Sequence, residues 1–367
     1  MINYAICSGL VLLAITVGLK LFHRGRRVVT PPVKPTTSSK KLPSTFDSVR
    51  PVIGFNVDAQ PPRPYAPWSG GKFQMTMGIR KTQEDSWLML DNRYREEQGL
   101  RERLLDSERA GVLQYLDGSE DACRETLEHI VAFLTRRFPD LFFRSPKDPN
   151  YLCNGITGAT FRVVDPLEQH PLEIAARLVM EDMNLLIQGA GPDPDEHYLR
   201  ASFSMAPAGW YLQERIGWPL WKIHTPVPMW EEKLRKPIEK YFRNMKISTP
   251  VERINFFMQT DKTLFQQEPF AAQRAENVKI QDIQVRHERQ TLRRLPRSRA
   301  ILFTVRTYLT PVVELASDKA SLYSLRESIR AMPEEMAKYK GRELWSDVFE
   351  GWAERELADY EPSQEGQ

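Results

Sequence analysis

The chain has 367 residues, of which 41% are hydrophobic and 27% are charged, and its net charge at pH 7 is +3. This composition excludes wholesale disorder and fibrous classes, and the near balance of charges does not indicate a nucleic-acid partner. The three cysteines, Cys7, Cys123 and Cys153, have no CxxC spacing. They are too few for a disulfide scaffold, an all-cysteine zinc site or an iron–sulfur cluster held by four thiolates.

An apolar run of 19 residues extends from Tyr4 to Phe22, and its single charge is Lys20. That length is enough to cross a bilayer as a helix, and the Lys20 side chain can reach the interface. Basic residues follow the run but do not precede it, so the positive-inside rule places the rest of the chain in the cytosol. We predict a single-pass transmembrane anchor over residues 1–27, in the endoplasmic reticulum membrane. A cleaved signal peptide and a buried core helix are the alternatives.

Residues 28–67 contain nine prolines and eight serines or threonines, without a periodic apolar pattern. This composition favours a semi-rigid linker with polyproline character, and disorder without a role explains it equally well. The folded body is predicted over residues 68–330, followed by an acidic C-terminal helix and tail over residues 331–367.

Apolar spacing in the body predicts a mixture of helices and strands without regular βαβ alternation. The resulting fold class is α+β with a largely antiparallel sheet. Helices are expected over 93–116, from Ser119 to Pro139, over 171–180 and 230–245, and from Pro311 onward. Strands are expected over 159–164, 184–188, 198–205, 285–295 and 300–309, while 251–259 fits either a strand or a helix.

The C-terminal segment has one apolar face at helical spacing, formed by Leu344, Trp345, Val348, Phe349 and Trp352. This pattern favours a helix packed on the body over a docking helix for a partner.

Several sequence motifs for catalysis and nucleotide binding are absent. There is no GxGxxG, no GxxxxGK[ST], no HExxH and no GxSxG. Six arginines lie between Arg286 and Arg299, at strand-like spacing, with Pro296 among them and no aromatic residue for stacking on bases. Ion pairs or the anionic groups of a cofactor explain these arginines better than nucleic-acid binding.

His224 lies in a proline-rich loop, GWPLWKIHTPVPMW, that extends from Gly217 to Trp230. Prolines fix φ and remove backbone donors, so this loop is stiff. A rigid loop that presents one imidazole among apolar groups suits an axial ligand to a haem iron. A purely structural histidine is the alternative, and His287, in the arginine-rich strand, is the only serious rival as a ligand.

Five stretches of the body resemble the α-subunit of haem-dependent oxidative N-demethylase, a family of bacteria and filamentous fungi. The resemblance covers roughly residues 68–325, and its most specific stretches contain IHTPVP and ERQTLRRLP. The five stretches are Trp87–Leu105, Leu178–Leu186, Ile216–Pro228, Val251–Asp261 and His287–Leu309. The family pattern has Gln and Trp where this chain has Met180 and Phe256, and neither change removes a proposed ligand.

The resemblance implies a PAS-like domain that holds haem b, with His224 as the axial ligand of the iron. It also implies catalytic roles for Arg253 and Glu288, and Arg293 and Arg294 are weaker candidates for contacts with the haem propionates. The structural alternatives are that Arg253 only pairs with Glu252 or Glu288, and that Glu288 only neutralises the surrounding arginines.

The implied reaction is a monooxygenase-type oxidative N-demethylation of a small amine with O2, which releases formaldehyde. Electrons are expected from a separate flavin- or ferredoxin-type reductase, because the chain has neither a Rossmann fingerprint nor enough cysteines for a thiolate-bound cluster. Two alternatives remain open: a non-catalytic haem-binding sensor or module with the same fold, and a scaffold that binds no haem.

Overall fold

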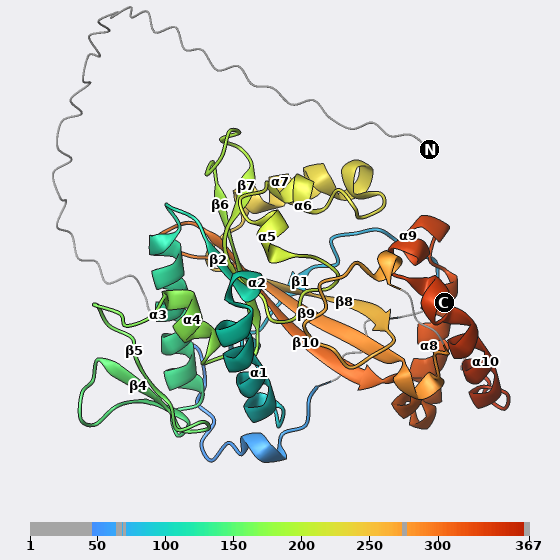
Figure 1. Cartoon of the computed structure of the whole chain (residues 1–367), viewed down its shortest axis with the longest axis horizontal. Helices are drawn as coiled ribbons and strands as arrows, with labels where there is room; N and C mark the ends of the chain where they lie inside the picture. The colour runs from blue at the N-terminus through green and yellow to red at the C-terminus, as the bar shows by residue number, and fades with distance from the viewer. Residues whose placement is uncertain (1–45, 64–67, 69–70, 274–276, 363–367) are drawn as a thin grey trace, which may run out of the picture. The chain divides into compact units, whose positions relative to one another are not determined.

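A seven-stranded antiparallel sheet forms the centre of the body in the computed structural model, which describes residues 46–63, 68, 71–273 and 277–362 (Figure 1). Its strand order is β1-β8-β9-β10-β6-β7-β2, so the predicted α+β class with an antiparallel sheet is confirmed. The strands are β1 (Arg80–Lys81), β2 (Leu113–Tyr115), β6 (Asp182–Gln188), β7 (His197–Phe203), β8 (Val251–Gln259), β9 (Gln284–Arg294) and β10 (Ile301–Pro311).

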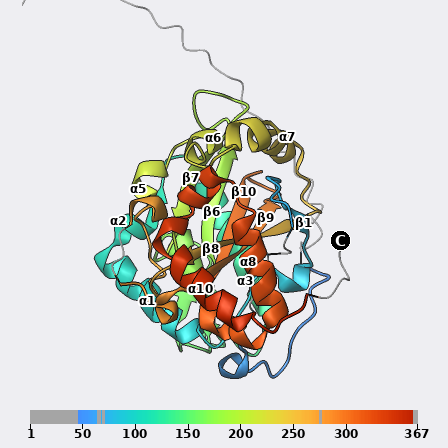
Figure 2. The ribbon, with the colours of Figure 1, turned by 90° about the vertical axis from the view of Figure 1, so that its right-hand side faces the viewer.

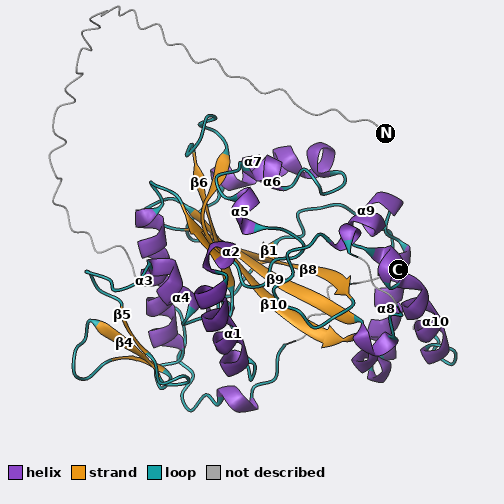
Figure 3. Cartoon of the chain, in the orientation of Figure 1, coloured by secondary structure: helices purple, strands orange, loops and turns teal. Residues whose placement is uncertain are grey.

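A second, three-stranded antiparallel sheet has the order β3-β4-β5 and is visible as the separate orange strands at the lower left of Figure 3. It comprises β3 (Phe142–Arg144), β4 (Tyr151–Asn154) and β5 (Thr160–Arg162). The helices are α1 (Tyr94–Ser107), α2 (Arg109–Val112), α3 (Glu120–Arg137), α4 (Pro171–Ala176), α5 (Leu212–Arg215), α6 (Leu220–Ile223), α7 (Arg235–Asn244), α8 (Lys319–Arg330), α9 (Glu334–Tyr339) and α10 (Ser346–Glu356).

The two longest strands, β9 and β10, pair over their whole length, and β8 pairs with the other edge of β9. The two strands predicted over 285–295 and 300–309 are therefore confirmed, and the ambiguous segment 251–259 is a strand. Every residue of β9 is buried, including its four arginines. Because a buried charge is costly unless it is paired or hydrogen-bonded, each of these arginines needs a partner from outside its own strand or from its neighbours.

The central sheet has two faces with separate apolar clusters. One face, here called the α6 face, packs Leu292 and Ile301 against residues of α5, α6 and α7. The other, here called the α1 face, packs Leu185 and Leu302 against α1, α3 and α4. Figure 1 shows these two groups of helices on different sides of the sheet. Alternation along each strand therefore decides which side chains share a face.

The predicted helix over 93–116 is wrong at its C-terminal end. Helix α1 ends at Ser107, a single turn forms α2, and the chain becomes β2, in which Leu113 pairs with Phe203 of β7. Pairing with the edge of the sheet outweighs the local helical preference. The predicted helix over 171–180 likewise ends at Ala176, before β6 begins.

The predicted linker over 28–67 extends too far. Phe46, Val49 and Val57 are each less than 5% exposed and belong to the main apolar cluster. Their irregular backbone is held by α3, since Arg136 and Arg137 donate to the carbonyls of Val49 and Arg50. Composition alone missed this packing because buried residues in irregular backbone have no periodic spacing.

The predicted membrane anchor over residues 1–27 lies outside the described residues. Among the residues that are described, no helix combines the length and the apolar character needed to cross a bilayer.

The C-terminal helix packs on the body, as predicted. Trp345, Phe349 and Trp352 are at most 7% exposed and contact residues of α8, and Figure 2 shows α8 and α10 side by side. The apolar face is thus covered within the chain, which favours the packed helix over the docking alternative.

Candidate functional site

The His224 imidazole is held by the turn that precedes it. Helix α6 is a single turn that follows Pro219, and His224 caps its C-terminal end. The Nδ1 atom lies 2.8 Å from the Leu220 carbonyl oxygen. Because a carbonyl can only accept, Nδ1 carries the proton, and the lone pair of the neutral ring is on Nε2. A histidine that ligates a metal commonly donates its other N–H to a backbone carbonyl in this way.

Burial, together with the smaller effect of the charges of Arg215 and Arg253, lowers the pKa of His224 to about 4, although the hydrogen bond to Leu220 opposes the shift. The imidazole is consequently neutral at pH 7, the form that binds a metal ion. Among the described residues, no hydrogen bond to Nε2 is recorded.

Trp230 fixes the plane of the imidazole. Its ring stacks on His224 with the centroids 4.0 Å apart and the planes 10° from parallel. The residue before it, Met229, has a φ of 60°, in the left-handed region that a side chain disfavours. A π-helical turn, Trp230–Leu234, follows. Backbone strain and π-helical turns both concentrate at functional sites.

A cavity of about 390 Å³ lies beside the His224 loop, within the size range of ligand sites. Pro226 and Pro228 form part of its wall, so the loop that carries His224 also shapes the cavity. Its remaining lining comes from three other segments: Ala208, Gly209, Arg215, Pro269, Phe270, Glu335, Lys338 and Tyr339.

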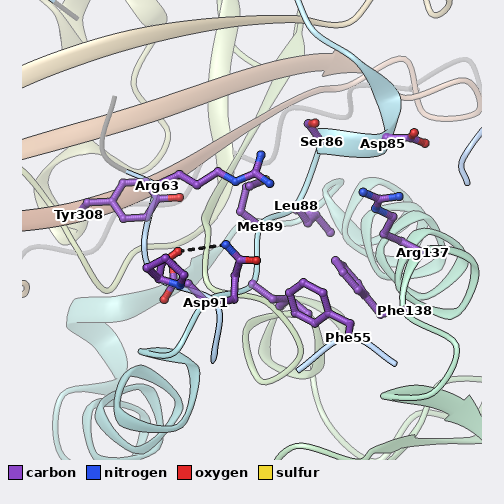
Figure 4. Close-up of a pocket in the computed structure, with 13 residues that line it drawn as sticks. Phe55, Arg63, Asp85, Ser86, Leu88, Met89, Asp91, Arg137, Phe138 and Tyr308 are labelled. Atoms are coloured by element: carbon purple, nitrogen blue, oxygen red, sulfur yellow. Dashed lines mark hydrogen bonds between the residues drawn. The ribbon is translucent and has the colours of Figure 1, made fainter. Parts of the chain in front are cut away.

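Another recorded cavity, near Asp91 and Tyr308, has a volume of only about 50 Å³ (Figure 4). Arg63, Asp85 and Arg137 are among the residues that line it. This volume suits a few water molecules and is too small for a cofactor.

Within the described part of the chain, Arg253 is a cation without a hydrogen-bond or ion-pair partner. It is half-buried on β8, its buried Nε atom has no acceptor, and among the described residues it makes no recorded hydrogen bond or ion pair. Burial lowers its pKa, and the charge of Glu288 opposes that shift. It does not pair with Glu252, which binds Arg289 at 2.6 Å and Arg80 at 2.8 Å.

Glu288 is a carboxylate held by three donors. Gln290 donates from 3.1 Å, Asn255 from 3.3 Å and Arg286 from 3.4 Å. Asn255 is directly opposite Glu288 in the sheet, and Arg253 is opposite Gln290, so the four side chains share the α6 face. Arg286, Glu288 and Gln290 occupy alternate positions of β9 and therefore lie on one face.

Electrostatic contacts connect these groups to His224 and to the cavity. The charge of Arg253 contributes to the lowered pKa of His224, and the charge of Glu288 opposes the lowering of the Arg253 pKa. Burial raises the pKa of Tyr339, which lines the cavity; the charge of Arg215 opposes this shift and that of Glu288 adds to it. The structure therefore brings His224, Arg253 and Glu288 to one region on the α6 face.

The other predicted residues are placed differently. Arg293 lies on the α1 face, where it binds Glu84 at 2.7 Å and stacks 3.8 Å from the Trp87 ring. Arg294 donates to the carbonyls of Phe242 and Arg299. His287 packs near Trp68, with ring centroids 5.4 Å apart, on the face opposite Glu288. None of the three joins the group around His224.

Sequence reasoning missed Arg215, Asn255, Tyr339 and Lys340. Asn255 had a usable signal, since it is two residues after Arg253 on a strand and must share its face. Lys340 had none, because it reaches the site from the C-terminal region, where its ammonium donates to the Phe256 carbonyl.

Residues 78–350 match the sequence model of a family described as haem-dependent oxidative N-demethylase, alpha subunit-like. The match covers most of the described body, including the strands and loop that carry His224, Arg253 and Glu288. The chain therefore belongs to the haem-dependent oxidative N-demethylase, alpha subunit-like family.

Proposed function

We propose that this protein binds haem b through His224 and uses O2 to remove a methyl group from a small amine, with release of formaldehyde. The observation that carries the proposal is the neutral His224 imidazole, which donates from Nδ1 to the Leu220 carbonyl and so keeps the lone pair of Nε2 for a metal. Its loop lines a cavity of about 390 Å³ through Pro226 and Pro228. Electrons come from a separate flavin- or ferredoxin-type reductase, since the sequence has neither a Rossmann fingerprint nor enough cysteines for a thiolate-bound cluster.

The residues present fit a haem group. Pro226, Pro228 and Phe270 supply apolar walls for a flat macrocycle. Haem also carries two propionates, and Arg215, a cation that lines the cavity, has no ion pair among the described residues. Arg293 and Arg294, whose guanidinium groups are occupied elsewhere, are left out of the proposed propionate contacts.

When bound, haem supplies the redox chemistry of the reaction. The chain's own residues bind and orient the other reactants. The Glu288 carboxylate attracts the ammonium form of an amine and holds or moves a proton at its Oε atoms. The Arg253 guanidinium, with its free donor, binds an anionic group or an oxygen atom near His224. The proline-rich loop keeps the imidazole in place and limits the entry of water.

The PAS-like fold is part of this proposal. It is supported by the connection of the central strands: the β6–β7 hairpin, a helical crossover through α5–α7, and then the consecutive strands β8, β9 and β10, the last of which pairs with β6.

The test uses the full-length protein purified in detergent and supplied with haem. We expect a Soret band that shifts on reduction and with carbon monoxide, and formaldehyde release when reductant and N-methylated amines are added. A Soret band without formaldehyde would indicate a haem-binding sensor or module. Absence of a Soret band after haem addition would contradict haem binding itself.

We also propose that residues 1–27 anchor the protein in the endoplasmic reticulum membrane with the body in the cytosol. The support is the apolar run Tyr4–Phe22 with basic residues only on its C-terminal side. Protease added to sealed microsomes should digest the body, and detergent should not be required. Full protection of the body until detergent is added would contradict this orientation.

A further inference from the structure

Lys340 is connected to Glu288 through the side chain of Asn255. The Lys340 ammonium donates to the Phe256 carbonyl at 2.5 Å and to Asn255 Oδ1 at 3.4 Å. The Asn255 Nδ2 atom in turn donates to Glu288 Oε2 at 3.3 Å. Three side chains from α9's C-terminal cap, β8 and β9 thus form one line of hydrogen bonds that ends on the carboxylate.

The ammonium group is enclosed by aromatic rings. Its nitrogen lies 4.7 Å from the centre of the Phe256 ring and 4.6 Å from that of Phe257, distances at which a cation is attracted to the ring face. Burial lowers the pKa of Lys340 to about 8, with Glu288 opposing the shift and Arg253 adding to it. At pH 7 the group therefore still carries its proton and its charge.

The donor and acceptor inventory fixes the orientation of Asn255. A lysine ammonium has three donors and no acceptor, so the end of the amide that meets it must be the oxygen. The amide nitrogen then has to face Glu288. A donor directed at a carboxyl oxygen stabilises the ionised form of that group.

We propose that Lys340 is a positioning residue, which holds Asn255 with its amide donor toward Glu288 and thereby keeps Glu288 in the ionised form that receives an amine cation. The role in receiving the amine rests on the proposed function, whereas the effect on the charge of Glu288 does not. Without Lys340, the amide is free to turn and present its oxygen, an arrangement that favours the protonated carboxyl.

Other charged groups face Glu288 and remain in place when Lys340 is changed. Arg286 donates a hydrogen bond to it from the same strand, and Arg253 on β8 and Tyr339 on α9 interact with it electrostatically. Their contribution is constant across the variants, so a difference between variants reports Lys340 and Asn255.

The test follows protonation of Glu288 by infrared titration of the haem-free, full-length protein, with the Glu288→Gln variant used to identify the carboxyl band. We expect Lys340→Met and Asn255→Leu each to move the midpoint upward by about one pH unit. Lys340→Arg keeps a cation that has only hydrogen-bond donors, so Glu288 in this variant should have the wild-type midpoint. Lys262→Met, which removes an exposed lysine beyond β8, is the matched control and should have no effect.

The double variant Lys340→Met with Asn255→Leu shows whether Lys340 acts on the Glu288 midpoint through Asn255 or independently of it. If the two residues act in series, the double variant moves the midpoint no further than either single change. A wild-type midpoint in Lys340→Met, or a double shift equal to the sum of the single shifts, would overturn the proposal. If Lys340→Met does not fold, the comparison of Asn255→Leu with Lys340→Arg decides, since only the former should shift.

In the haem-loaded protein, Lys340→Met should raise KM for the amine several-fold more than it lowers kcat. If the wild type releases no formaldehyde, the proposed function fails, but the infrared titration still decides the role of Lys340.

Discussion

Replacement of His224 by alanine should remove most of the bound haem, while replacement of His287 by alanine should leave the Soret band nearly unchanged. His224 has a neutral imidazole whose Nδ1 atom donates to the Leu220 carbonyl, and its loop lines the cavity of about 390 Å³ through Pro226 and Pro228. His287 lies on the opposite face of the sheet, packed near Trp68. The measurement is the absorption spectrum of each purified variant after addition of haem, with the ratio of haem to protein determined for each.

A loss of fold in the His224 variant would also release haem, so two controls are needed. The thermal midpoint of the haem-free variant should stay close to that of the haem-free wild type, because the main apolar clusters do not depend on the imidazole. Added imidazole should restore part of the Soret band by filling the space that the alanine leaves. If the His287 variant loses haem and the His224 variant retains it, the ligand assignment is wrong.

The sequence was most informative where burial is periodic. The apolar face of α10 was predictable because helically spaced residues meet the core. The segment around Phe46 and Val57 was not, because its buried residues occur in irregular backbone. The end of α1 was missed for a different reason: the pairing of Leu113 with Phe203 is a tertiary contact with no local signal.

The site shows the same division. The stiffness of the His224 loop follows from its prolines, which are a local property. That Arg253 and Glu288 share a face depends instead on the pairing of β8 with β9. The partners of the arginines are not local: Arg293 is taken by Glu84 and Arg289 by Glu252, from segments far away in the sequence. Lys340 reaches Asn255 from 85 residues further along the chain. Only the folded structure distinguishes Arg253, which has no ion pair among the described residues, from the arginines that have one.

The changes Glu288→Gln and Arg253→Ala should leave haem bound but reduce the rate of formaldehyde release. Glutamine keeps the shape of the Glu288 side chain and its acceptor oxygen, but it removes the negative charge that attracts an amine cation and the group that holds a proton. Loss of a positioned acid–base group typically costs about 100-fold or more in rate. Arg253 has no hydrogen-bond or ion-pair partner among the described residues, so its replacement by alanine should remove binding of an oxygen or anionic group without disturbing the sheet.

The rates are measured under saturating reductant with variants that contain equal amounts of haem. Matched controls are Glu354→Gln on α10 and Arg103→Ala on α1, both exposed and remote from the α6 face, and both should retain the wild-type rate. A wild-type rate in Glu288→Gln would mean that the carboxylate serves only as the partner of Arg286 and its neighbours. Loss of haem in Arg253→Ala would show instead that this guanidinium binds a propionate, because the cofactor would then supply the anion that the described residues do not.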